Sequence, residues 1–224
     1  MSDDQNSWLR IDEQTDVIAS LLVCLLCIEK VNEEPMLWKQ VIVSLHNALQ
    51  GAMVCHLSGT AQMGALDNRS WSKTYEWHER DRAGKIEFDV VHVDGRPVRR
   101  AKSAQDEFPS QRLAAANTLF SRLHDEGNRR EAAGCIIETT EEQAKSFERL
   151  HTLRNGFSHF TPAGWSIELA GLPKICLDCL NVIKLIFQDD WAFRHMNSHE
   201  KATLADLIVS LEKLFTSMRG RYKS

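Results

Sequence analysis

Long segments of this chain repeat apolar residues at intervals of three and four, and this spacing constrains the fold more than any other feature. The first segment covers about residues 13–31, and the second begins at Pro35 and runs to about Leu57. An α-helix turns once every 3.6 residues, so each repeat marks one buried face. In the first segment Leu22 and Val23 widen that face, which favours a central position for this helix.

Four further helical segments are predicted downstream. They cover Phe108 to about Glu126, a stretch beginning at Thr139 or Thr140, a stretch beginning at Pro173, and about Ser198 to Arg219. A threonine followed by acidic residues is typical of a capped first turn. The sequence "WSIELA", Trp165–Ala170, predicts a short strand. Six such helices predict a mainly α protein built as an up-and-down helical bundle.

One region interrupts this helical pattern. The sequence "KIEFDVVHVDGRPVRRAK" alternates apolar and polar residues and contains Asp94-Gly95, a strong signal for a two-residue hairpin turn. Pro97 lacks a backbone N–H and restricts the second strand to a sheet edge. We therefore expect one domain over residues 1–224, with an insertion at about 63–104 that contains a small β-hairpin.

Composition narrows the possible partners. The net charge is -4, so nucleic acid would have to be bound by a local basic patch. The longest uncharged apolar stretch, Val17–Ile28, has 12 residues, and this is too short to span a bilayer. No secretory signal opens the sequence, so we expect a cytoplasmic protein without membrane contact and with reduced cysteines.

Two cysteine pairs have a spacing that zinc sites also use. Cys24–Cys27 and Cys176–Cys179 each stand three apart. Both pairs lie in apolar helical segments, where cysteine behaves as a small hydrophobic residue. We interpret them as core residues and expect no metal site.

The stretch "LHTLRNGFSHF" places polar residues near the end of a predicted helix. His151, Asn155 and His159 stand four apart and would share one stripe, whereas Arg154 lies about 140° around the axis from His159. RNA cleavage without a metal needs a base for the 2′-hydroxyl proton, and histidine can act as that base near neutral pH. Arginine keeps its charge and binds phosphate oxygens. The alternative is a helix end with ordinary surface polar residues.

Residues 154–159, "RNGFSH", match the R-N-x-x-x-H form of the R-x(4–6)-H motif, and this region resembles the HEPN superfamily. Phe160, Pro162, Gly164 and Trp165 look like the continuation seen in bacterial HEPN-like proteins of defence or toxin type. A tyrosine two places after the histidine marks the branch regulated by nucleotidylation, and here that position is Thr161.

The resemblance implies a helical bundle that forms a two-fold homodimer, with motifs from both copies in one composite cleft. It also implies a metal-independent endoribonuclease without cofactors, which leaves 2′,3′-cyclic phosphate ends and acts with an antitoxin or defence-system partner protein. Arg154 and His159 would be catalytic and Asn155 would support them. The alternative function is a non-catalytic module that binds RNA, a nucleotide or a protein partner.

Three further residues are candidate substrate-binding groups. His151 shares the motif stripe, and Arg99 and Arg100 could guide an RNA backbone by charge if the hairpin reaches the cleft. The alternative for the two arginines is a solvated basic strand edge that discourages aggregation. His46 could reach a site in the centre of the bundle, although a satisfied or surface histidine is the more common environment.

Overall fold

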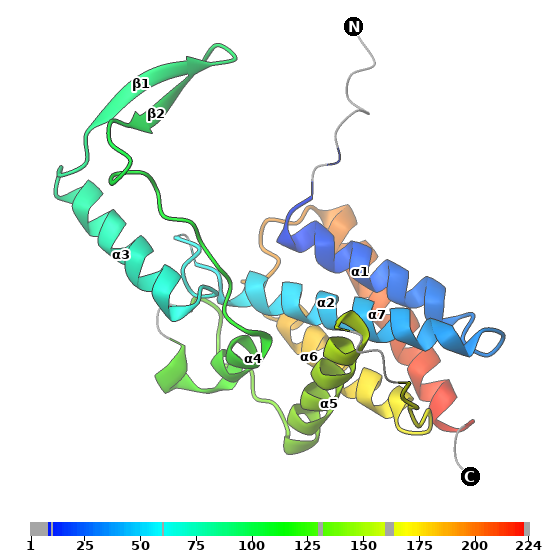
Figure 1. The fold of residues 1–224 in the computed structure, drawn as a ribbon. Helices are drawn as coiled ribbons and strands as arrows, with labels where there is room; N and C mark the ends of the chain where they lie inside the picture. The colour runs from blue at the N-terminus through cyan, green and yellow to red at the C-terminus, as the bar shows by residue number, and fades with distance from the viewer. Residues whose placement is uncertain (1–8, 10, 60, 130–131, 160–163, 222–224) are drawn as a thin grey trace, which may run out of the picture.

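A computed structural model describes residues 9, 11–59, 61–129, 132–159 and 164–221. The described residues form seven α-helices, two short 3₁₀-helices and one hairpin (Figure 1). In chain order these elements are α1 (Glu13–Ile28), η2 (Pro35–Leu37), α2 (Trp38–Leu57), α3 (Asn68–Arg82), β1 (Phe88–Val93), β2 (Arg96–Ala101), α4 (Ala116–His124), η3 (Glu126–Asn128), α5 (Glu141–Ser158), α6 (Leu172–Gln188) and α7 (Ser198–Arg219). The predicted mainly α architecture with a small hairpin is confirmed.

The centre of the bundle is α2, which packs against α1, α4, α5 and α6. Its buried positions lie around most of its circumference, and they include His46 in the middle of the helix. The expectation that the first helix is central was wrong. Because α1 packs only against α2 and α7 among the named elements, it leaves Leu22, Val23 and Leu26 between 44% and 53% exposed.

Three helices begin with reciprocal caps that the sequence encodes directly. Asp12 caps α1 together with Thr15, and Thr140 caps α5 together with Gln143. Asn197 caps α7 together with Glu200. In each box a side chain accepts a hydrogen bond from an otherwise unpaired N–H of the first turn. These caps set the starting points of the helices, including the one that carries the motif.

The hairpin prediction is confirmed in detail. Asp94 and Gly95 both have positive φ, 50° and 75°, as a tight two-residue hairpin turn requires. Phe88 pairs with Ala101 at one end of the ladder, and Val93 pairs with Arg96 at the other. With only two strands, both are edges, so Pro97 fits without breaking a central ladder.

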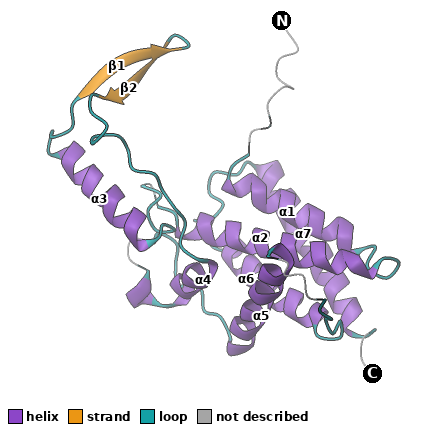
Figure 2. Ribbon diagram, viewed as in Figure 1, coloured by secondary structure: helices purple, strands orange, loops and turns teal. Residues whose placement is uncertain are grey.

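The insertion also contains α3, a helix that apolar spacing does not reveal. Only Ser70 and Thr74 are buried along it, so the helix has no continuous apolar stripe. Trp77 packs against Phe88 and Phe108, so its indole contacts the hairpin and the segment that follows it. Figure 2 shows α3 and the hairpin projecting away from the other helices.

Two other segments differ from the sequence prediction. Residues 108–115 are not helical, because backbone hydrogen bonds from Ala114 to Ala65 and from Asp67 to Arg112 hold this stretch extended. The predicted helix therefore begins only at Ala116. Residues 165–170 form no strand. Ile167 and Leu169 pack against the core, but no neighbouring described strand pairs with them.

Both cysteine pairs lie on helices, as expected. Cys24, Cys176 and Cys179 are buried, and Cys27 is half-buried. Burial raises the pKa of the Cys24 thiol to about 12. No group of three His, Cys, Asp or Glu residues that could hold a metal is found in the described ranges. Among the same residues, no helix combines the length and apolar character needed to cross a membrane.

Thr140→Ala is expected to lower the free energy of unfolding by about 1 kcal/mol, because it removes the cap of α5. The matched control is Thr152→Ala on the exposed surface of the same helix, which should be neutral or stabilise by a few tenths of a kcal/mol. Urea denaturation followed by circular dichroism measures both changes. Equal effects at the two positions would contradict the capping role.

Candidate functional site

Four polar side chains from α2 and α5 form a continuous hydrogen-bonded chain. Arg154 Nη1 lies 3.1 Å from Asn155 Oδ1, and Asn155 Nδ2 lies 3.1 Å from His151 Nε2. His151 Nδ1 lies 2.9 Å from His46 Nε2. We call Arg154, Asn155, His151 and His46 the relay. It joins the polar end of α5 to the middle of the central helix.

The fixed charge of Arg154 sets the direction of every bond in the relay. A guanidinium only donates, so Asn155 accepts through its oxygen and must donate its amide N–H to His151 Nε2. His151 then carries its proton on Nδ1 and donates it to His46 Nε2. His46 in turn carries its proton on Nδ1, where no described group accepts it. Both imidazoles are therefore neutral and have the same tautomer.

Burial and charge act in the same direction on these imidazoles. Burial lowers the pKa of His46 to about 4, with smaller contributions from the positive charge of Arg154 and from His151. The pKa of His151 is also lowered, by burial and then by Arg154. Desolvation disfavours the charged form of histidine, and a neighbouring cation disfavours it further. At neutral pH the relay thus contains one positive charge, located on Arg154.

Aromatic rings continue the relay into the core. The His151 ring stacks on His46 with centroids 5.2 Å apart. It also stacks on Phe147, one turn earlier in α5, with centroids 6.0 Å apart. Phe147 also stacks on Phe120 of α4, at 4.1 Å. These stacking contacts hold the imidazole planes in place, so the relay is rigid at its buried end.

Arg154 itself lines a hollow between α1, α2 and α5 whose wall combines polar and apolar groups. The hollow has a volume of about 240 Å³, and Asp16, Asn47 and Gln50 are among its lining residues. No ion pair with a described carboxylate neutralises the guanidinium, and its Nε has no hydrogen-bond partner. Arg154 therefore has no direct ion-pair partner among the described residues, although the carboxylates of Glu13 and Asp16 line the same solvent-accessible cavity.

His159 occupies a different position from the one that helical spacing predicts. It is the C-cap of α5, with φ -116° and ψ 57°, so it leaves the stripe shared by His151 and Asn155. Its backbone N–H donates to the Asn155 carbonyl, and its side chain is exposed. Within the described residues no hydrogen bond joins His159 to Arg154 or to Asn155 Oδ1. Phe160, Thr161 and Pro162 lie outside the described residues.

The two hairpin arginines lie far from the motif. Figure 1 shows β2 beyond the far end of α3, well separated from α5. Arg99 lies over the Phe88 ring at 3.8 Å and contacts Asp81 at 3.3 Å, so it anchors the hairpin to α3. Arg100 is exposed. Within one chain the structure brings together Arg154, Asn155 and His151, but neither hairpin arginine.

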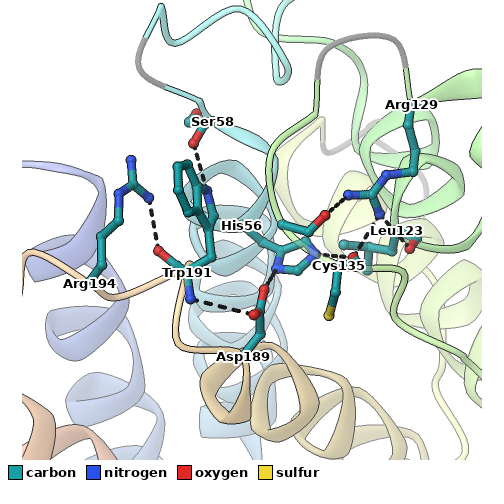
Figure 3. A network of polar contacts seen from close by, with 9 residues as sticks. His56, Ser58, Leu123, Arg129, Cys135, Asp189, Trp191 and Arg194 are labelled. Atoms are coloured by element: carbon teal, nitrogen blue, oxygen red, sulfur yellow. Dashed lines mark hydrogen bonds and ion pairs between the residues drawn. The ribbon is translucent and has the colours of Figure 1, made fainter.

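A second polar cluster stabilises the end of α2 (Figure 3). The fully buried His56 has Nδ1 3.0 Å from Asp189 Oδ2, and its Nε2 donates to the Cys135 carbonyl at 2.8 Å. Arg129 donates to the carbonyls of Leu123, Gly134 and Cys135. These bonds join α2, the end of α6 and the chain before α5. Because the ring is fully buried between these elements and its Nε2 is bonded to a backbone carbonyl, we assign this cluster a structural role.

An apolar hollow opens beside the end of α5. It has a volume of about 430 Å³, and Trp38, Phe157 and Trp165 contribute to its lining. Trp165 lies against Gly156, where an added Cβ would approach its ring to 3.3 Å. The glycine inside the motif therefore allows the indole to pack directly on the helix.

Comparison of the chain with models of known protein families, with curated proteins and with solved structures finds no match. The resemblance to the HEPN superfamily therefore rests on residues 154–159 and their continuation.

His46 is expected to make stability depend on pH in a defined window. Its pKa is about 4 in the folded protein against 6.5 ordinarily, so the unfolded chain binds a proton that the folded chain rejects. The contribution of neutral His46 to the free energy of unfolding is fully present above pH 6.5, and it falls by about 3 kcal/mol as the pH drops to 4. His46→Gln should flatten this part of the curve in urea denaturation.

The control for this measurement is His195→Gln, because His195 is exposed and lies outside the relay. Its stability curve should follow that of the wild type between pH 6.5 and pH 4. If the wild-type and His46→Gln curves run parallel over this window, the buried neutral imidazole is refuted.

Proposed function

We propose that this protein is a HEPN-like, metal-independent endoribonuclease of toxin or phage-defence type. The observation that carries the proposal is the placement of Arg154, which makes no ion pair with a described carboxylate, is hydrogen-bonded to Asn155 and lines a solvent-accessible hollow. A planar guanidinium in such a position suits the phosphoryl oxygens of RNA. The exposed His159 lies five residues further along, in the order that the motif requires.

The proposed reaction divides the work between these groups. His159 takes the proton of the 2′-hydroxyl, and the resulting oxygen attacks the adjacent phosphorus. The bond from phosphorus to the 5′-oxygen breaks, which leaves a 2′,3′-cyclic phosphate and a 5′-hydroxyl after protonation of the leaving oxygen. Arg154 stabilises the negative charge that develops on the phosphoryl oxygens. Asn155 and the neutral His151 position the guanidinium.

A second copy of the chain would complete the cleft, while the proton that His159 has taken up passes to the leaving oxygen. Among the described residues no hydrogen bond joins His159 to Arg154 within one chain, so we propose a homodimer in which one cleft combines the motifs of both copies. The exposed apolar side chains of α1, which include Leu22 and Leu26, offer a surface of the kind that protein interfaces use. An antitoxin or defence-system partner would act on this dimer.

One observation favours a second candidate function. The relay directs Asn155 toward His151 and His46 rather than toward His159. A rigid cationic site without a paired base suits a module that binds RNA, a nucleotide or a protein partner and does not cleave. Single-variant cleavage assays separate the two functions.

RNA cleavage in the presence of EDTA is expected for the wild type. Arg154→Ala should reduce the rate by about 10²–10³, as loss of a charge-stabilising donor does, and His159→Ala by about 10²–10⁴, as loss of a general base does. Gel analysis of a labelled RNA with end-group mapping measures the rate and the cyclic phosphate. The matched control is His199→Ala, an exposed histidine on α7, which should cleave normally. Undiminished cleavage by both motif variants would refute the catalytic assignment.

Mixing the two inactive variants tests the composite cleft. A dimer with one Arg154→Ala chain and one His159→Ala chain retains one arginine and one histidine in its shared cleft, so activity should rise well above that of either variant alone. The mixture is refolded or co-expressed before the assay, and sedimentation verifies the dimers. A dimeric but inactive mixture would show that each chain uses its own pair.

A further inference from the structure

The hollow beside Arg154 contains an unusual combination of polar groups. Glu13 and Asp16 from α1 provide two carboxylates, and Asn47 and Gln50 from α2 provide two amides. Arg154 of α5 lies at the same cavity. Three helices thus direct a cation, hydrogen-bond acceptors and hydrogen-bond donors to one place.

These groups are available to a ligand. No ion pair between described residues engages Glu13 or Asp16, although Arg154 lines the same cavity. Asn47 and Gln50 have no side-chain hydrogen bond within the described residues either. Glu13 and Asn47 are exposed, and Asp16 and Gln50 are half-buried, so a ligand can reach all four side chains.

The size of the hollow limits what can enter. Its volume of about 240 Å³ lies below the roughly 300–1,000 Å³ typical of pockets for drug-sized ligands. Gly51 forms part of the wall, where an added Cβ would come within 2.9 Å of Val17 and 3.9 Å of Asp16 Oδ2. Val54 and Leu113 add apolar surface. A single planar group fits this space better than a whole nucleotide.

We propose that this hollow is a guanine subsite, which selects the base on the 5′ side of the cleaved bond. Guanine alone among the four RNA bases presents both a ring N–H and an exocyclic amine side by side on one edge, and the carboxylates of Glu13 and Asp16 can accept both. Carboxylate recognition of base amines follows the general rules of base readout. The amides of Asn47 and Gln50 can donate to O6 and N7.

The subsite places the phosphate where the proposed reaction needs it. With guanine in the hollow, the 3′-phosphate of that nucleotide extends toward Arg154 at the cavity edge. One consequence of this inference, preferential cleavage after guanosine, rests on the proposed nuclease function. Binding of the base itself does not require cleavage, so the two can be tested separately.

Isothermal titration calorimetry with nucleoside 3′-monophosphates tests the subsite directly. Guanosine 3′-monophosphate should bind the full-length protein about tenfold or more tightly than the adenosine, cytidine and uridine compounds, because each lost hydrogen bond to a charged group costs about 1.5–3 kcal/mol. Asp16→Asn and Glu13→Gln should each weaken guanosine binding by about tenfold and leave the affinity for adenosine nearly unchanged. Inosine 3′-monophosphate, which lacks the exocyclic amine, should bind more weakly than guanosine.

The matched control is Glu29→Gln, which removes a carboxylate from the exposed opposite end of α1; its guanosine affinity should equal that of the wild type. Equal affinity for the four nucleotides, no nucleotide binding, or unchanged guanosine binding in both hollow variants would overturn the subsite. Cleavage in EDTA without preference for guanosine would overturn it as well and leave the nuclease proposal intact. Selective guanosine binding without any cleavage would keep the subsite and remove the nuclease.

Discussion

The hydrogen bond from Arg154 to Asn155 determines which atom donates and which accepts in every other hydrogen bond of the relay. Because the guanidinium can only donate, the amide, both imidazoles and their tautomers follow from this one contact. All three hydrogen bonds of the relay run in the same donor-to-acceptor direction, from the polar end of α5 into the middle of α2. A lysine could supply the same charge, but its rotating ammonium would not fix the Asn155 amide as a planar guanidinium does.

The relay occupies a place that a simple core would fill with apolar residues. His46 is 1% exposed, and its Nδ1 proton has no described acceptor. A buried unpaired donor of this kind costs about 1–3 kcal/mol. His56 is likewise fully buried, and its Nδ1 also lacks a described hydrogen-bond partner, although Asp189 Oδ2 lies 3.0 Å away. The relay differs in its link to Arg154, which lines a solvent-accessible hollow.

Features that depend on nearby residues could be predicted from the sequence. The cap of α5, expected at Thr139 or Thr140, and the Asp94-Gly95 turn each depend on a few adjacent positions; the structure has the cap at Thr140 and confirms the turn. The helix α3 could not be found by apolar spacing, because it buries only Ser70 and Thr74. The extended segment before α4 depends on backbone bonds to residues some 45 positions earlier, which local propensity does not encode.

The candidate site was predictable to a similar extent. Spacing correctly placed His151 and Asn155 on one stripe, because both lie within regular helix. It misplaced His159, because the helix ends at Ser158 and the next residue leaves helical geometry. The sequence marked His46 as a histidine that could reach the centre of the bundle, but it did not reveal its partner, because His151 lies 105 positions away and only the packing of α2 against α5 brings the two rings together. The acceptors of the hollow come from α1 and its amides come from α2, and they carry no motif.

The most direct test of this account is nitrogen-15 NMR of the histidine rings at pH 7, with assignments from His46→Gln and His151→Gln. Both rings should be neutral with the proton on Nδ1, and Arg154→Ala should release them to mixed tautomers. A protonated ring, or a proton on Nε2 of either histidine in the wild type, would contradict the claim that one guanidinium orients the site.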